Sequence, residues 1–106
     1  MAKYMILASY TAEGTQGLLK EGGSSRRATI DSLMTGLGGK LEAFYYAFGE
    51  SDVVVIVDAP DNVAAAAVSL AVNASGAVSA RTVVLMTPEE MDQAAKMSVS
   101  YTAPGR

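Results

Sequence analysis

The clearest structural pattern in the chain is LEAFYYAFGESDVVVIVDAP, from Leu41 to Pro60. Its first part, Leu41–Phe48, carries four aromatic residues in eight, and Val53–Val57 is a run of five β-branched residues. Aromatic and β-branched residues both favour β-strands. The segment between the two runs is short, polar and opened by Gly49, so we expect the runs to pair as a β-hairpin.

Strand and helix patterns alternate on either side of this hairpin. Lys3–Thr11 alternates with apolar residues on both faces, which is typical of a buried central strand. Ala12–Gly39 is helical with a break at Gly22-Gly23, because consecutive glycines are costly inside a helix. Val63–Ser75 has a helical pattern, and Ala77–Met86 alternates as a fourth strand. This order predicts an α+β fold of the ferredoxin-like split βαββαβ type, a four-stranded antiparallel sheet with its helices on one face.

A short C-terminal helix follows the fourth strand. Thr87, Pro88 and Glu90 occupy the N-cap, first and third positions of a capping box. We expect the helix to run to about Ser98. We therefore divide the 106-residue chain into one domain, residues 1–98, and a tail, residues 99–106.

The helix Val63–Ser75 bears on the oligomeric state. We expect Val63 and Leu70 to belong to its core stripe, which leaves Val68 and Val72 on the opposite, outer side. All four strands are apolar on both faces, whereas the helices cover only one face of the sheet. A second copy is the simplest cover for the other face, so we expect a homodimer or higher homo-oligomer.

Composition narrows the functional classes. The formal net charge is −3, which argues against nucleic-acid binding. Cysteine and histidine are both absent, so the chain has no thiolate nucleophile, no sulfur-ligated metal and no histidine base or ligand. Half the residues are hydrophobic, but no apolar run approaches the ~20 residues that span a bilayer. We expect a cytoplasmic protein with no membrane partner, no metal and no cofactor.

Four segments resemble the GYD-domain family: KYMILASYT, GLLKEGGSSRR, LGGKLEAFYYAFGESDVVVIVDAPDN and GAVSARTVVLMTPEEM. The resemblance covers nearly the whole chain and implies a ferredoxin-like domain allied to the dimeric α+β barrel superfamily. The family signature places a tyrosine between glycine and aspartate, where this chain has Ser51 in Gly49-Glu50-Ser51-Asp52. The wider superfamily includes haem enzymes and cofactor-independent oxygenases. Because this chain has no histidine, it lacks the usual haem ligand.

The hairpin also carries the candidate ligand site. Asp52 starts the third strand, and Arg27 lies near the apolar stripe of its helix, so we expect these two charges to pair. Tyr10 and one of Tyr45 or Tyr46 would supply apolar walls, since adjacent strand residues face opposite sides. Such a site suits a small apolar or aromatic molecule with one carboxylate or carbonyl. The alternative is that these residues form an ordinary core with one ion pair.

A second candidate is an anion site at the helix start after Gly22-Gly23. Ser24, Ser25 and Arg26 would bind phosphate or carboxylate there, or one of the serines would simply cap the helix.

Three functional hypotheses follow: an oligomeric small-molecule-binding module, a structural module, and a cofactor-independent α+β barrel enzyme acting on a small aromatic or keto compound. Tyr, Arg and Asp suffice for proton transfer.

Overall fold

The computed structural model describes all 106 residues. In chain order its elements are β1 (Ala2–Tyr10), α1 (Ala12–Glu21), α2 (Gly23–Gly36), β2 (Lys40–Tyr46), β3 (Val53–Ala59), α3 (Asn62–Ala74), β4 (Val78–Leu85) and α4 (Pro88–Lys96). The predicted split βαββαβ order and the terminal helix are confirmed. The helical region before the hairpin is divided into α1 and α2 at Gly22, whose φ of 88° suits glycine.

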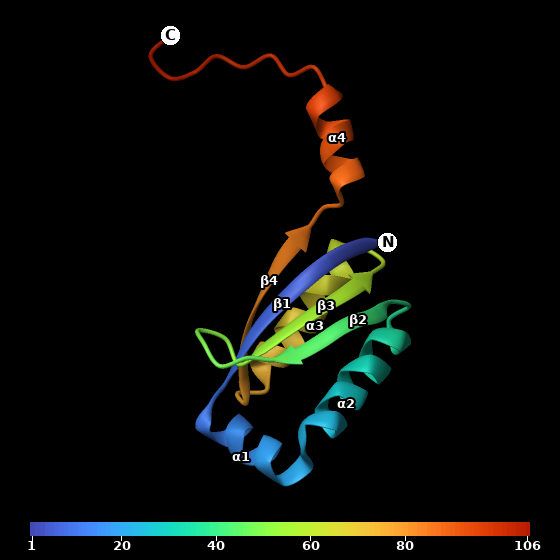
Figure 1. The fold of residues 1–106 in the computed structure, drawn as a ribbon, viewed down its shortest axis with the longest axis vertical. Helices are drawn as coiled ribbons and strands as arrows, with labels where there is room; N and C mark the ends of the chain where they lie inside the picture. The colour runs from blue at the N-terminus through green and yellow to red at the C-terminus, as the bar shows by residue number, and fades with distance from the viewer.

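The four strands form one antiparallel sheet in the order β2-β3-β1-β4. α2 and α3 lie side by side over one face of this sheet, and α1 runs across the end where β1 finishes (Figure 1). α2 packs mainly along β2, and α3 mainly along β4. Each helix therefore covers one edge of the sheet, and the two central strands lie beneath the space between them.

The core fills the space between the helices and the sheet. Alternate residues of β3, Val53, Val55, Val57 and Ala59, are buried under the helices. Tyr4 joins them from β1, Met34 from α2 and Val68 from α3. The period of two along β3 and β1 thus selects the face that contacts the helices.

The predicted orientation of α3 is wrong. Val68 is buried and 6% exposed, whereas Leu70 is 72% exposed and Val63 is 78% exposed. The helix is apolar on nearly every side, so hydrophobic periodicity alone does not define its inner face. A polar residue fixes the rotation instead. The Asn73 side chain accepts from the Ala80 N–H at 2.8 Å and donates to the Ala80 carbonyl at 3.1 Å. These two bonds also satisfy backbone groups on the edge strand β4.

The helix ends follow local side-chain chemistry with one exception. Asp61 caps α3, and Thr87 with Glu90 forms the predicted capping box of α4. The expected cap of α2 by Ser24 or Ser25 is wrong, because the N-cap is Gly22 and makes no side-chain bond. α2 already begins at Gly23, so both serines lie inside its first turn.

The second face of the sheet carries no helix (Figure 1). Met5, Leu7, Val54, Ile56 and Val83 lie on it, since they pair with one another across β1, β3 and β4 and alternate with the buried set. We call this surface the open face. At one end, Lys3 forms ion pairs with Glu42 and Asp58, the latter at 3.1 Å.

α4 projects beyond the end of the sheet, and the tail continues away from it (Figure 1). Every residue of α4 is exposed. None of the helices combines the length and the hydropathy that crossing a bilayer requires.

Candidate functional site

A cleft opens between α2 and α3, with the sheet as its floor and α1 across its end. It consists of an outer hollow of about 490 Å³ and a smaller inner hollow of about 60 Å³. The two hollows share the lining residues Tyr10, Arg26, Ile30, Val72 and Val78. The inner hollow is apolar apart from Arg26, and it reaches the core residues Val55 and Met34. We call the combined space the helix cleft.

Arg26 is the one cation in the helix cleft. It lies on the inner side of α2 with Ile30 and Leu33, four and seven residues further along, and is partly buried. No carboxylate forms an ion pair with it, although Glu13 and Glu21 line the same outer hollow. A guanidinium beside an apolar floor is therefore left with its hydrogen-bonding capacity free for an acidic or carbonyl oxygen.

Tyr46 lies on the helix-facing side of β2, beside the helix cleft but not among its lining residues. Its hydroxyl donates to the Gly23 carbonyl at 3.1 Å, and a Cβ at Gly23 would lie only 2.9 Å from the tyrosine ring. Phe44 packs edge-on against Tyr46, with ring centroids 5.4 Å apart. Glycine at position 23 thus lets the start of α2 contact the sheet directly.

The hydroxyl of Tyr46 lies in the electrostatic environment of Tyr10 and Arg26. Desolvation raises the pKa of Tyr46 to about 12, with a further increase from Tyr10 and an opposing effect from the Arg26 guanidinium. Tyr46 is therefore protonated at neutral pH and acts as a hydrogen-bond donor. Two tyrosines and one arginine converge at the β2 side of the cleft.

The structure brings together only part of the predicted site. Tyr10 lines the helix cleft and Tyr46 lies close to it, but Tyr45 points to the open face and is 70% exposed. Arg27 is exposed and forms no ion pair, so the expected Arg27–Asp52 pair is absent. Asp52 instead accepts a hydrogen bond from the Tyr10 N–H at 2.9 Å.

The neighbouring arginine takes the inner position expected for Arg27. Arg26 belongs to the anion site proposed with Ser24 and Ser25, but those serines are exposed on the first turn of α2. The spacing from Arg26 to Ile30 and Leu33 is helical, but so is the spacing from Arg27 to Ile30 and Met34, so the sequence alone does not choose between them. The contribution of α1, whose Gly14, Gly17 and Leu18 line the cleft, has no comparable signal.

No group of three or more histidine, cysteine, aspartate or glutamate side chains is placed to hold a metal ion. The functional groups in and beside the helix cleft are Arg26, Tyr10 and Tyr46, around an apolar cavity.

Comparison with known protein families then gives one match: the family model described as the GYD domain covers residues 4–95. The chain belongs to the GYD domain family. The match includes β2, β3 and β4, all but the first two residues of β1, and almost the whole of α4. Neither the curated proteins nor the solved structures contain a match to this chain. In this GYD domain, Ser51 lies in the hairpin loop on the open face and does not line the helix cleft.

Proposed function

We propose that this GYD domain binds a small molecule in the helix cleft. The ligand has an apolar or aromatic body and one carboxylate or carbonyl oxygen. The observation that carries the proposal is the partly buried, unpaired Arg26 at the junction of the two hollows. A few polar groups in an otherwise apolar cavity are typical of ligand sites.

The polar groups define how such a ligand would lie. Its apolar part would lie in the outer hollow against Ile30, Val72 and Val78, since the inner hollow of about 60 Å³ is too small for an aromatic ring, and its oxygen would accept from Arg26. Glu13 and Glu21 at the outer hollow would repel a second anionic group. A ligand with one anionic group fits better than one with two.

The test is titration with 1-naphthoate, an aromatic monocarboxylate, followed by two-dimensional amide NMR. We expect shifts at Gly14, Thr29 and Ile30, which line the cleft, and not at open-face residues such as Ile56. Arg26→Gln should weaken binding about tenfold, since it removes a charge-assisted hydrogen bond.

Two variants make this test specific. Arg27→Gln removes an exposed arginine one residue away and should bind naphthoate as the wild type does. Gly17→Met adds a side chain in open space within the cleft and should block binding without a clash. Shifts confined to the open face, or equal binding by the Arg26 and Arg27 variants, would reject the cleft as the site.

We further propose that a second copy of the chain covers the open face. The support is the row of apolar side chains there, Met5, Leu7, Val54, Ile56 and Val83, with no helix over them. Identical apolar faces can meet around a two-fold axis. Light scattering should give at least twice the monomer mass, and Ile56→Lys should reduce it to the monomer. A wild-type monomer at micromolar concentration would refute this part alone.

A catalytic function has one specific observation in its favour. The unpaired Arg26 guanidinium, with the protonated Tyr46 hydroxyl near it, could polarise a carbonyl oxygen, as an enzyme acting on a small keto compound requires. The Tyr46 hydroxyl has one proton, so it would have to exchange the Gly23 carbonyl for the substrate oxygen. The test is deuterium uptake from solvent at the carbon beside the carbonyl of phenylpyruvate. Exchange above the buffer rate that falls in Tyr46→Phe would support catalysis, and exchange at the buffer rate would reject it for this substrate class.

A further inference from the structure

A second hollow lies on the open face, separated from the helix cleft by the sheet. Its volume is about 400 Å³. β1 contributes Leu7 and Ser9, the hairpin loop contributes Glu50 and Ser51, and β4 contributes Ser79, Ala80 and Arg81. The loop forms one wall, because the Ser9 hydroxyl donates to the Glu50 carbonyl at 3.3 Å and the Asp52 N–H donates to the Ala8 carbonyl at 2.8 Å. We call this space the open-face hollow.

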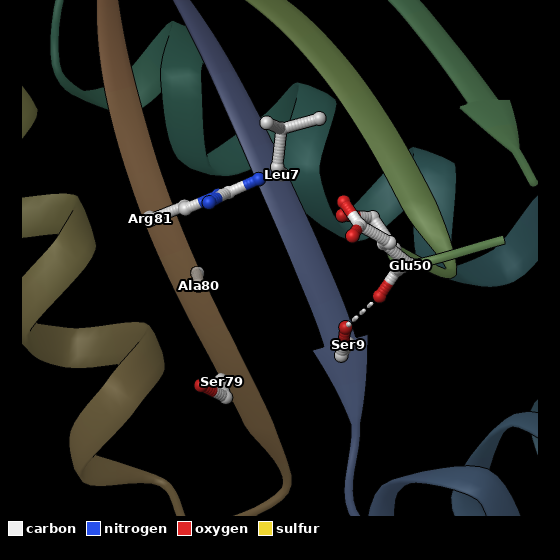
Figure 2. Close-up of a pocket in the computed structure, with 7 residues that line it drawn as sticks. Leu7, Ser9, Glu50, Ser79, Ala80 and Arg81 are labelled. Atoms are coloured by element: carbon white, nitrogen blue, oxygen red, sulfur yellow. Dashed lines mark hydrogen bonds between the residues drawn. The ribbon is translucent and has the colours of Figure 1, made fainter.

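Charges of opposite sign line the open-face hollow from two sides. Figure 2 shows Arg81 reaching from β4 across towards Leu7, while Glu50 comes from the loop on the other side of β1. Neither charge forms an ion pair within the chain. The alternation of β4 places Arg81 on the open face, since it pairs with Leu7. A cation and an anion thus line the same space without neutralising each other.

The rest of the lining is polar and small. The hydroxyls of Ser51 and Ser79 make no hydrogen bond to the protein, and Leu7 and Ala80 are the apolar members. A site of this composition offers several hydrogen bonds but little apolar surface for a large ring or chain. It therefore differs in chemistry from the apolar helix cleft with its single cation.

We infer that the open-face hollow binds a small zwitterion of the amino-acid class. Its carboxylate pairs with Arg81, its ammonium group pairs with Glu50, and a short polar side chain bonds to the serine hydroxyls. A guanidinium matches a carboxylate in geometry as well as in charge. A molecule that carries both charges is attracted by both Arg81 and Glu50. A simple anion or cation is attracted by one of these residues and repelled by the other.

The experiment is a titration of the full chain with L-serine, monitored by amide NMR. Acetate and ethanolamine, which carry one charge each, are the matched probes. We expect L-serine to shift the amides of Ser9, Ser51 and Ser79 in a saturable way at millimolar concentration, and each single-charge probe to bind about tenfold more weakly or worse. Arg81→Gln and Glu50→Gln should each weaken L-serine binding about tenfold. Higher salt should weaken it as well, because the site is exposed.

The control variant is Arg26→Gln, which alters the helix cleft and should leave L-serine binding unchanged. In the same way, Arg81→Gln should leave naphthoate binding unchanged. The two proposed ligand sites are therefore tested independently. The inference requires that a second copy on the apolar row leaves the hairpin-loop end of the open face accessible, although Leu7 belongs to both the row and the hollow. The absence of saturable shifts overturns the inference, whether the hollow is empty or filled by the second copy. Equal responses to all three probes, or unchanged binding in Arg81→Gln, overturn it too.

Discussion

The Asp52 carboxylate accepts a hydrogen bond from the backbone N–H of Tyr10 at 2.9 Å. This bond joins the last residue of β1 to the residue before β3, and it holds Tyr10 at the mouth of the helix cleft. Beside it, the Asp52 N–H donates to the Ala8 carbonyl at 2.8 Å. Asp52 therefore links the hairpin loop to the central strand through both its side chain and its backbone.

Removal of the Asp52 acceptor should lower stability. Asp52→Ala leaves the partly buried Tyr10 N–H without its partner, and we expect a loss of about 1–3 kcal/mol in the free energy of unfolding. Arg27→Ala should change it by less than about 0.5 kcal/mol, because that side chain is exposed and unpaired. Urea denaturation of both single variants and the double variant measures this. A measurable coupling energy between the two positions would mean that Arg27 and Asp52 do interact, which would contradict the structure.

The rotation of α3 gives a second prediction. Val68→Ala removes buried methyl groups from the core and should cost about 2 kcal/mol. Leu70→Ala, at a 72% exposed position of the same helix, should cost less than about 0.5 kcal/mol. The measurement is again the urea midpoint. The opposite ranking would mean that α3 presents Leu70 to the sheet, as hydrophobic periodicity alone suggested.

The fold could be predicted because several local signals agree. The hairpin, the glycine break and the Thr87 capping box each specify one element, and the element order then leaves few topologies. The rotation of α3 could not be predicted, since alanine and valine occupy almost every side of the helix. The hydrogen bonds between Asn73 and the backbone of Ala80 fix this rotation, and they depend on where β4 lies in the sheet.

The candidate site was predicted in part for a related reason. Strand alternation predicts that only one of Tyr45 and Tyr46 faces the helices, and the register of β2 with β3 shows that it is Tyr46. Arg26 and Arg27 differ by about 100° around the helix, and both have helical spacing to apolar residues of α2. The way α2 packs on the sheet decides between them, and the sequence does not show it. The opposed charges of Arg81 and Glu50 are distant in sequence, and only the β1–β4 pairing and the loop position bring them to one hollow.

Two glycines in α1 should respond oppositely to the same substitution. A Cβ at Gly14 would lie 2.0 Å from the Ala77 carbonyl oxygen, whereas nothing lies within 4 Å of a Cβ at Gly17. Gly14→Ala should destabilise the fold by about 1–3 kcal/mol through overpacking. Gly17→Ala should stabilise it by about 0.4–1 kcal/mol, because alanine restricts the unfolded chain. Thermal and urea unfolding measure both; equal effects would show that α1 does not pack against the residues before β4.

The stability of helix α4 should depend on pH through the Glu90 carboxyl group. Hydrogen bonds from the backbone and side chain of Thr87 lower the pKa of Glu90 below its ordinary value of 4.5. The ionised carboxylate is the form that these bonds favour, so their contribution is fully present above pH 4.5 and is lost as the pH falls through the lowered pKa. Amide chemical shifts along α4 should therefore report loss of helix in acid. The matched control is Glu90→Gln, which retains a capping-box acceptor but does not titrate. Its helix content should fall less over this pH range than that of the wild type, while the Glu89 and Asp92 carboxyls of α4 remain in both proteins. If both proteins lose α4 at the same pH, the Glu90 carboxylate does not control the stability of this helix.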